Sequence, residues 1–139
     1  METVTWSKNY ETGNPIVDGQ HKNLFVMINN LKVGLSEKQS KITLVDTIER
    51  LSSYVETHFK TEEDLMQTSH YPDYAKHKEE HDSLREQAEK LIQLFKMDKV
   101  DLTATISKFL SDWLQHHINE IDIKMIKWVQ EKEKIELMR

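Results

Sequence analysis

The chain has 139 residues, a length that suits one domain with a substantial core, and it contains no cysteine. The missing thiols exclude disulfides, zinc fingers and iron–sulfur ligation, and the net charge of −5 argues against nucleic acid as the main partner. No stretch approaches the roughly 18 uninterrupted apolar residues of a membrane span. The opening METVTWSKNYETG lacks the basic and then apolar order of a secretory signal. We therefore expect a soluble cytoplasmic protein that binds neither nucleic acid nor membranes.

The chain is predicted to start with an arm, residues 1–18, that turns at Gly13-Asn14-Pro15. Asp18 is a candidate N-cap for the first helix, and Pro72 suits the first turn of the third. The four helices are expected at 19–37, 42–67, 72–96 and 101–132, followed by a fraying tail. Because the connectors are short, consecutive helices should run antiparallel. The predicted fold of the single domain 1–139 is an all-α, up-down-up-down four-helix bundle with an N-terminal arm.

Each predicted helix carries an apolar stripe with alternating steps of three and four residues, and each stripe is interrupted by histidine. The histidines on the stripes are His21, His58, His77, His81 and His117. Glu62 lies on the second stripe, four residues after His58. Burying such groups without partners costs on the order of 2–7 kcal/mol each. A metal would turn them into ligands, so the pattern predicts a metal site in the core. The charged runs 78–80 and 131–136 are interpreted as solvated faces.

The fourth helix leaves two alternatives for the remaining ligands. Five histidines and one glutamate are too many for a single tetrahedral zinc, so a second carboxylate would suit a dinuclear centre. His116 and Glu120 form an i,i+4 pair but lie toward the edge of the stripe. His117 lies at its centre, yet Asp122 points about 120° away from the stripe in an ideal helix. A π-bulge would rotate Asp122 back by about 100°, and spacing alone leaves the choice open.

Four segments carry a set of ligand motifs: DGQHKNLF (18–25), HFKTEE (58–63), HKEEH (77–81) and WLQHHINEID (113–122). Together they resemble the hemerythrin family, in particular the single-domain bacteriohemerythrins. The arm with Trp6, Tyr10 and Gly13 is also similar to that family's N-terminal segment, so the resemblance covers nearly the whole chain. The family places its last histidine five residues before an aspartate, and this selects His117 and Asp122. Myohemerythrin is itself a standard four-helix bundle, so the resemblance implies the same fold.

The resemblance implies a cofactor of two non-haem iron ions with an oxo or hydroxo bridge. The implied metal ligands are His21, His58, Glu62, His77, His81, His117 and Asp122. The three histidines of the third and fourth helices would hold one iron. His21 and His58 would hold the other, which keeps an open position. Glu62 and Asp122 would bridge the pair.

The implied activity is reversible dioxygen binding at the open iron, for storage or for delivery to an oxygen-consuming enzyme as partner. The apolar residues implied around that position are Leu24, Phe59, Trp113, Leu114 and Ile118. They would exclude water and proton donors. The alternatives are an oxygen or redox sensor that acts through a separate partner, and a di-iron reductase of peroxide or oxygen. The ExxH motif of ferritin-like oxidases does not occur in the sequence, so we expect no enzymatic activity.

Overall fold

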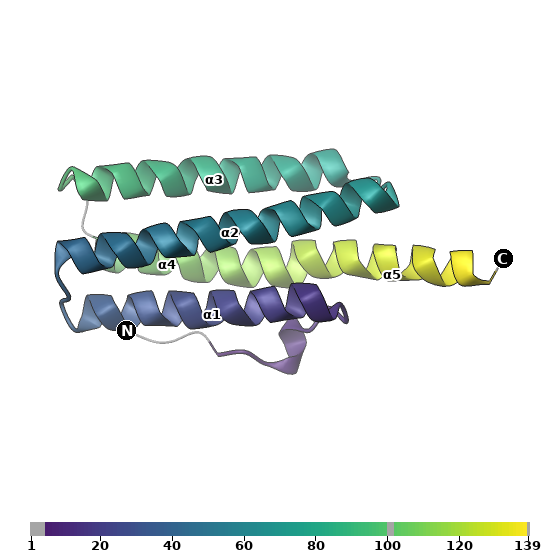
Figure 1. The fold of residues 1–139 in the computed structure, drawn as a ribbon, viewed down its shortest axis with the longest axis horizontal. Coiled ribbons are helices and arrows are strands. Elements are labelled where there is room, and N and C mark those ends of the chain that lie inside the picture. Colours follow the sequence, from purple (N-terminus) through teal and green to yellow (C-terminus); the bar gives the residue numbers. More distant parts are fainter. Residues whose placement is uncertain (1–4, 100–101, 139) are drawn as a thin grey trace.

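The computed structural model describes residues 5–99 and 102–138, and for 102–104, 106 and 107 it describes the backbone alone. The elements, in chain order, are the short 3₁₀ turn η1 (Lys8–Tyr10), α1 (Pro15–Ser36), α2 (Lys41–Ser69), α3 (Tyr74–Lys96), α4 (Leu102–His116), the π-helical segment η2 (His117–Asp122) and α5 (Ile123–Leu137). Because α4, η2 and α5 are continuous, the chain forms four helical rods that alternate in direction (Figure 1). The predicted all-α four-helix bundle is confirmed.

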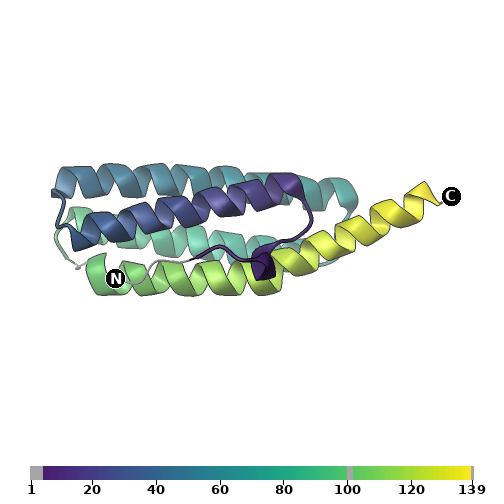
Figure 2. The same ribbon diagram turned by 90° about the horizontal axis from the view of Figure 1, so that it is seen from below.

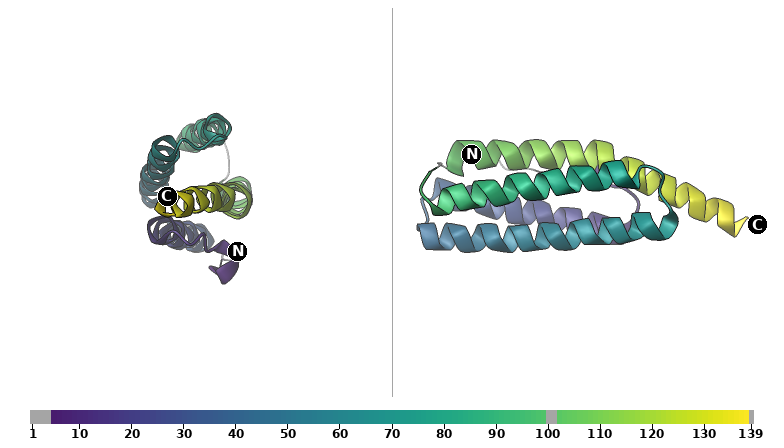
Figure 3. Two further views of the ribbon diagram at one scale, coloured as in Figure 1. Left: turned by 90° about the vertical axis from the view of Figure 1, so that its right-hand side faces the viewer. Right: turned by 90° about the horizontal axis from the view of Figure 1, so that it is seen from above.

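The rods pack with α1 against α2 and α4, and with α2 against α3 and α5 (Figure 3). The fourth rod changes direction where α4 gives way to α5, and the C-terminal end of α5 projects beyond the other helices (Figure 2). The change of direction coincides with η2, and π-helical turns are a known cause of helix bends. None of the described helices is long and apolar enough to cross a membrane.

The first helix begins at Pro15 rather than at residue 19, and the prediction of Asp18 as its N-cap is wrong. The N-cap is Asn14, whose side chain accepts hydrogen bonds from the backbone N–H groups of Ile16 and Val17. Asp18 instead accepts hydrogen bonds from the arm, at 2.9 Å from Thr12 N and 2.7 Å from Thr12 Oγ1. These bonds fasten the arm to the first turn of α1.

Two other helix ends differ from the prediction. The third helix begins at Tyr74, so Pro72 lies in the connector before it. The fourth rod continues to Leu137, past the expected end at residue 132, and the tail is helical where fraying was expected. The expected start of that helix, residue 101, lies outside the described residues.

The apolar core is divided into two clusters by a polar layer. On α1, Val17 belongs to one cluster and Leu24 to the other, and the buried His21 lies between them in the sequence. On α2, Phe59 and Met66 belong to different clusters, with the buried Glu62 between them. The fourth rod repeats the order with Ile118, Asp122 and Met125. The polar positions of all these helices therefore meet at one level of the bundle.

Candidate metal centre

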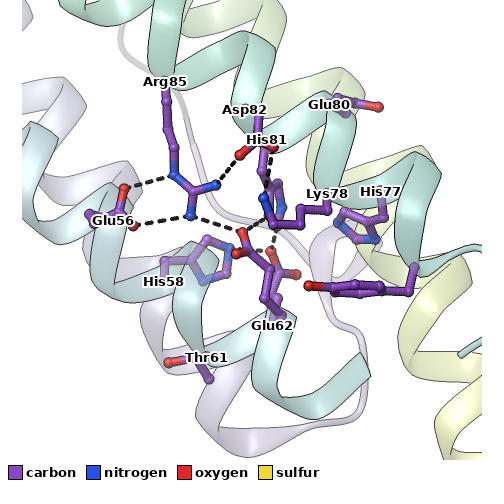
Figure 4. Close-up of polar contacts among 12 residues, drawn as sticks. Glu56, His58, Thr61, Glu62, His77, Lys78, Glu80, His81, Asp82 and Arg85 are labelled. Atoms are coloured by element: carbon purple, nitrogen blue, oxygen red, sulfur yellow. Dashed lines mark hydrogen bonds and ion pairs between the residues drawn. The ribbon is translucent and has the colours of Figure 1, made fainter. Parts of the chain in front are cut away.

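All seven residues expected as ligands are buried at this level of the bundle. They come from α1, α2, α3 and η2, so every rod contributes. The structure brings their ligand-type atoms together in two groups, and within each group these atoms lie within 4.8 Å of one another. The first group is Glu62, His77, His81, His117 and Asp122, and the second is His21, His58, Glu62 and Asp122. Figure 4 shows the α2 and α3 members facing each other across the two helices.

The two carboxylates belong to both groups and span them. Asp122 places Oδ2 2.8 Å from His21 Nε2, and Oδ1 2.9 Å from His117 Nε2. Glu62 places Oε1 3.2 Å from His58 Nε2 and 3.3 Å from His81 Nε2. Each carboxylate thus lies beside one histidine of the first group and one histidine of the second. The two candidate metal-binding groups therefore share both carboxylates.

The π-helical segment η2 brings both His117 and Asp122 into the core. In a π-helix, residues five apart lie on the same side, whereas in an α-helix Asp122 would turn away from His117. His116 and Glu120 are left outside, with side chains 57% and 66% exposed, and they pair with each other at 2.7 Å. The structure therefore decides between the two alternatives of the sequence: His117 and Asp122 lie in the cluster, and His116 and Glu120 do not.

The chemistry of this cluster fits a bound metal. Several buried polar atoms make no hydrogen bond of good geometry within the described chain, although some lie at ion-pair distance from one another: both oxygens of Glu62, both ring nitrogens of His77 and Oδ1 of Asp122. The Nε2 atoms also converge in pairs, 3.1 Å apart between His21 and His58 and 3.1 Å apart between His81 and His117. Unpartnered buried polar groups are costly, and cations between them would remove the cost. Nitrogen and oxygen donors without sulfur suit iron, manganese, zinc or nickel.

The electrostatics of the cluster also favour cations. Burial by itself would lower the pKa of His58, but the charges of Glu62 and Asp122 outweigh it and raise that pKa to about 9. Burial likewise opposes charge on His117, yet Asp122 holds its pKa well above the usual value. Burial disfavours ionisation of Asp122, but His117 lowers its pKa well below the ordinary range. Without metal the carboxylates favour the protonated forms of His58 and His117, and metal cations would take the place of those protons.

Three histidines are oriented by outer acceptors on their Nδ1 atoms. Nδ1 of His58 lies 2.8 Å from Gln20 Oε1, Nδ1 of His81 lies 2.7 Å from Glu63 Oε2, and Nδ1 of His117 lies 3.1 Å from Glu80 Oε1. A histidine that donates Nδ1–H to such an acceptor can present the lone pair of Nε2 to a metal, and acceptors of this kind are common behind metal-bound histidines.

Sequence reasoning missed these three acceptors. Glu80 was assigned to a solvated charged face, but its side chain is only 28% exposed and bonds to His117. A signal was present, because each acceptor is the sequence neighbour of a cluster residue: Gln20 precedes His21, Glu63 follows Glu62, and Glu80 precedes His81. In every case the acceptor bonds to a histidine on a different helix. That partnership depends on the packing of the rods and cannot be seen in a single helix.

The apolar residues expected near the centre are all buried. Phe59 stacks on the ring of His81, with centroids 3.9 Å apart and planes 10° apart. The rings of Trp113 and His117 have centroids 5.8 Å apart and planes 23° apart. Both aromatic side chains therefore stack on histidines of the first group. Leu24, Leu114 and Ile118 belong to the same core cluster as these rings.

Known proteins share both the sequence and the fold. The profile of the "Hemerythrin HHE cation binding domain" matches residues 12–129. The chain is 32% identical over 123 residues to a bacteriohemerythrin of Methylococcus capsulatus, covering 88% of this chain and 93% of the relative. It is 34% identical over 119 residues to a hemerythrin of Themiste dyscrita, covering 86% and 88%.

Solved structures agree with these matches. A crystal structure of wild-type hemerythrin superposes with a TM-score of 0.82 at 32% identity, covering 88% of this chain and 94% of that one. The matched range begins at the arm's end, reaches into all four rods and includes the whole buried cluster. The chain therefore belongs to the hemerythrin family and carries its metal-binding domain.

Proposed function

We propose that this protein binds dioxygen reversibly at a centre of two non-haem iron ions joined by an oxo or hydroxo bridge, and that it stores dioxygen or delivers it to oxygen-requiring enzymes. The observation that carries the proposal is the pair of donor groups that share Glu62 and Asp122. Seven protein ligands exceed what one ion takes, and shared carboxylates suit two ions a short distance apart. Membership of the hemerythrin family supports iron as the metal and dioxygen as the ligand.

The two metal positions differ in the number of protein donors. His77, His81 and His117 serve the first position, and only His21 and His58 serve the second. Both share the two carboxylates, so the second position has one donor fewer. The lower number of donors leaves a coordination position for a small ligand. Dioxygen is of the right size, and it needs no hydrogen-bonding pocket to be recognised.

The apolar surroundings support reversible binding. Bound iron supplies the electrons that dioxygen draws on while it is held. The side chains of Leu24, Leu114 and Ile118 are buried in the cluster that adjoins the centre, and they offer no proton. Excluding water limits the protons that could convert the ligand irreversibly. The residues of this chain thus hold the metals, orient Nε2 atoms inward and keep water away.

The proposal is tested by loading the protein with ferrous iron under argon and following its visible absorption. We expect about two irons per chain after washing. A band should appear in air and disappear under argon over repeated cycles. One iron per chain would contradict the di-iron centre. Irreversible oxidation would favour the sensor, and continuous consumption of added reductant would favour the reductase.

A further inference from the structure

Arg85, on α3, lies at the centre of an ion-pair network beside the metal centre. Its Nε and one Nη atom lie 2.8 and 3.1 Å from the carboxylate of Glu56. Its other Nη atom donates to Asp82 at 2.7 Å. The guanidinium also donates to Glu63 Oε2 at 2.9 Å. Figure 4 shows Arg85 between Glu56 on α2 and Asp82 on α3. The planar guanidinium is therefore fixed in place by three carboxylates.

The carboxylate of Glu63 connects this network to the centre. The same oxygen that accepts from Arg85, Oε2, lies 2.7 Å from Nδ1 of His81. The side chain of Glu63 is only 14% exposed, so its charge is largely withdrawn from water. An unpaired carboxylate in that position would gain by turning to solvent. Arg85 supplies the opposite charge that lets Glu63 stay on His81.

Arg85 also lies over the aromatic ring that packs against His81. Its guanidinium carbon is 5.1 Å from the ring centroid of Phe59, and Phe59 stacks on His81 at 3.9 Å. Arg85 thus contacts both side chains that orient His81: Glu63, which bonds to its Nδ1, and Phe59, which stacks on its ring.

The other supported histidines differ in this respect. Gln20, the acceptor for His58, is neutral and is held by a hydrogen bond to Thr61 at 3.0 Å. Glu80, the acceptor for His117, has His116 and His117 as its ion-pair partners. His81 is the histidine whose acceptor is held by an arginine.

We propose that Arg85 is a positioning residue of the metal centre, which holds Glu63 on Nδ1 of His81 and thereby keeps Nε2 of His81 directed at the metal. This inference depends on the proposed iron at that site. A carboxylate behind a histidine ligand makes the histidine a stronger donor and fixes its tautomer. Without Arg85, Glu63 leaves His81, and both effects are lost.

The first experiment is a double-mutant cycle on iron retention. Ferrous protein is challenged with an excess of a ferrous chelator under argon, and the rate of iron loss is measured for wild type, Arg85→Met, Glu63→Ala and the double variant. We expect Arg85→Met and Glu63→Ala each to lose iron about 10-fold faster than wild type, the lower end of the effect of removing an outer-shell partner. The double variant should match Glu63→Ala, because Arg85 acts through Glu63.

The control is Arg50→Met, since Arg50 is an exposed arginine in an ion pair with Asp46 at 3.0 Å. It should retain iron like wild type. Equal iron loss in Arg85→Met and Arg50→Met would overturn the proposal. So would an undiminished effect of Arg85→Met in the Glu63→Ala background, because Arg85 would then act only by tying α3 to α2. Helicity and the melting temperature of the metal-free variants are measured alongside.

The second readout is the midpoint potential of the iron-loaded protein under argon. Loss of the carboxylate makes His81 a weaker donor to ferric iron, so Glu63→Ala and Arg85→Met should both raise the potential. A lower potential in Arg85→Met would show that Glu63 keeps its bond to His81 without help, which contradicts positioning. Neither measurement involves dioxygen. If wild type binds iron but not dioxygen, the proposed function is wrong, but iron retention and the midpoint potential still test the role of Arg85.

Discussion

At the residue scale, two adjacent histidines have opposite surroundings. His117 is fully buried and has carboxylate oxygens on both ring nitrogens, Asp122 on Nε2 and Glu80 on Nδ1. His116 is exposed and pairs with Glu120 on the surface. An exposed pair of this kind contributes little to stability. The residues that match a simple i,i+4 ligand pattern are therefore the ones that the structure leaves out of the cluster.

His117→Ala should remove one or both irons, whereas His116→Ala should keep both. The buried side chain supplies a donor to the first group, and its loss removes one partner each from Asp122 and Glu80. Asp122→Ala should likewise damage the site more than Glu120→Ala. The measurement is iron per chain after loading and washing. The ligand assignment is wrong if iron survives His117→Ala but is lost in His116→Ala.

Leu114→Ala should spare iron binding and shorten the lifetime of the oxygenated form, by about 10-fold or more. The smaller side chain opens space beside polar groups, and such a space fills with water that can deliver protons. Ile118→Ala should act in the same direction. The decay of the visible band in air-exposed samples measures the effect.

The matched control for the apolar residues Leu114 and Ile118 beside the centre is Leu31→Ala. Leu31 is buried in the same core cluster, but it lies ten residues along α1 from His21, about 15 Å at 1.5 Å per residue. Both leucine variants should lose about 2–5 kcal/mol of stability, the usual cost of this truncation in a core. Equal decay rates of the oxygenated form in Leu114→Ala and Leu31→Ala would show that Leu114 contributes only to core packing.

At the scale of elements, the sequence predicts the helices better than their ends. Apolar stripes depend on a regular period that persists over many residues, so the four rods were found. The start of α1 was missed because Asn14 and Pro15 are favoured both in turns and at helix N-termini, and they were assigned to a turn. Propensity cannot separate the two uses. Only the packing of Val17 and His21 into the core shows that the helix has already begun.

In the candidate site, too, the sequence predicts some residues and misses others. The histidines and Glu62 stand out because they interrupt apolar stripes. Asp122 was left open, since a π turn changes the register of the backbone without a characteristic residue. Arg85 and Glu63 were not found at all. Charged residues at the border of a stripe are usually solvated, and their partners here lie on a neighbouring helix.

Deleting Asn119 should preserve the metal site. A π segment holds one residue more than the α-helix it replaces, and Asn119 is exposed within η2. Its deletion would place His117 and Asp122 four apart in a regular α-helix, which keeps both on one face. The control is deletion of Lys127, an exposed residue of α5, which should move Val129 out of the core. Helicity and iron content report the outcome, and complete loss of iron in both variants would contradict the idea.

At the scale of the whole molecule, the bundle is two apolar clusters joined through a polar layer. The layer contains one residue or pair from each rod, so the four rods meet where their charges are concentrated. A hydrophobic layer in this position would hold the rods together without help. The polar layer should do so better when its donors bind cations, so folding and metal binding should be coupled.

The metal-free protein should therefore be less stable than the iron-loaded protein, and by an amount that grows with free metal. A ligand that binds only the folded state stabilises it by RT ln(1 + [L]/Kd), which is about 2.7 kcal/mol at 100 times Kd. For a domain of this size that corresponds to a melting temperature about 10 °C higher. Thermal unfolding of both forms in one anaerobic buffer, at several concentrations of ferrous iron, measures the shift. His117→Ala should show a smaller shift than His116→Ala, because only His117 belongs to the cluster. Equal melting temperatures with and without iron would mean that the buried layer is satisfied by its own protons and that metal binding contributes nothing to holding the rods together.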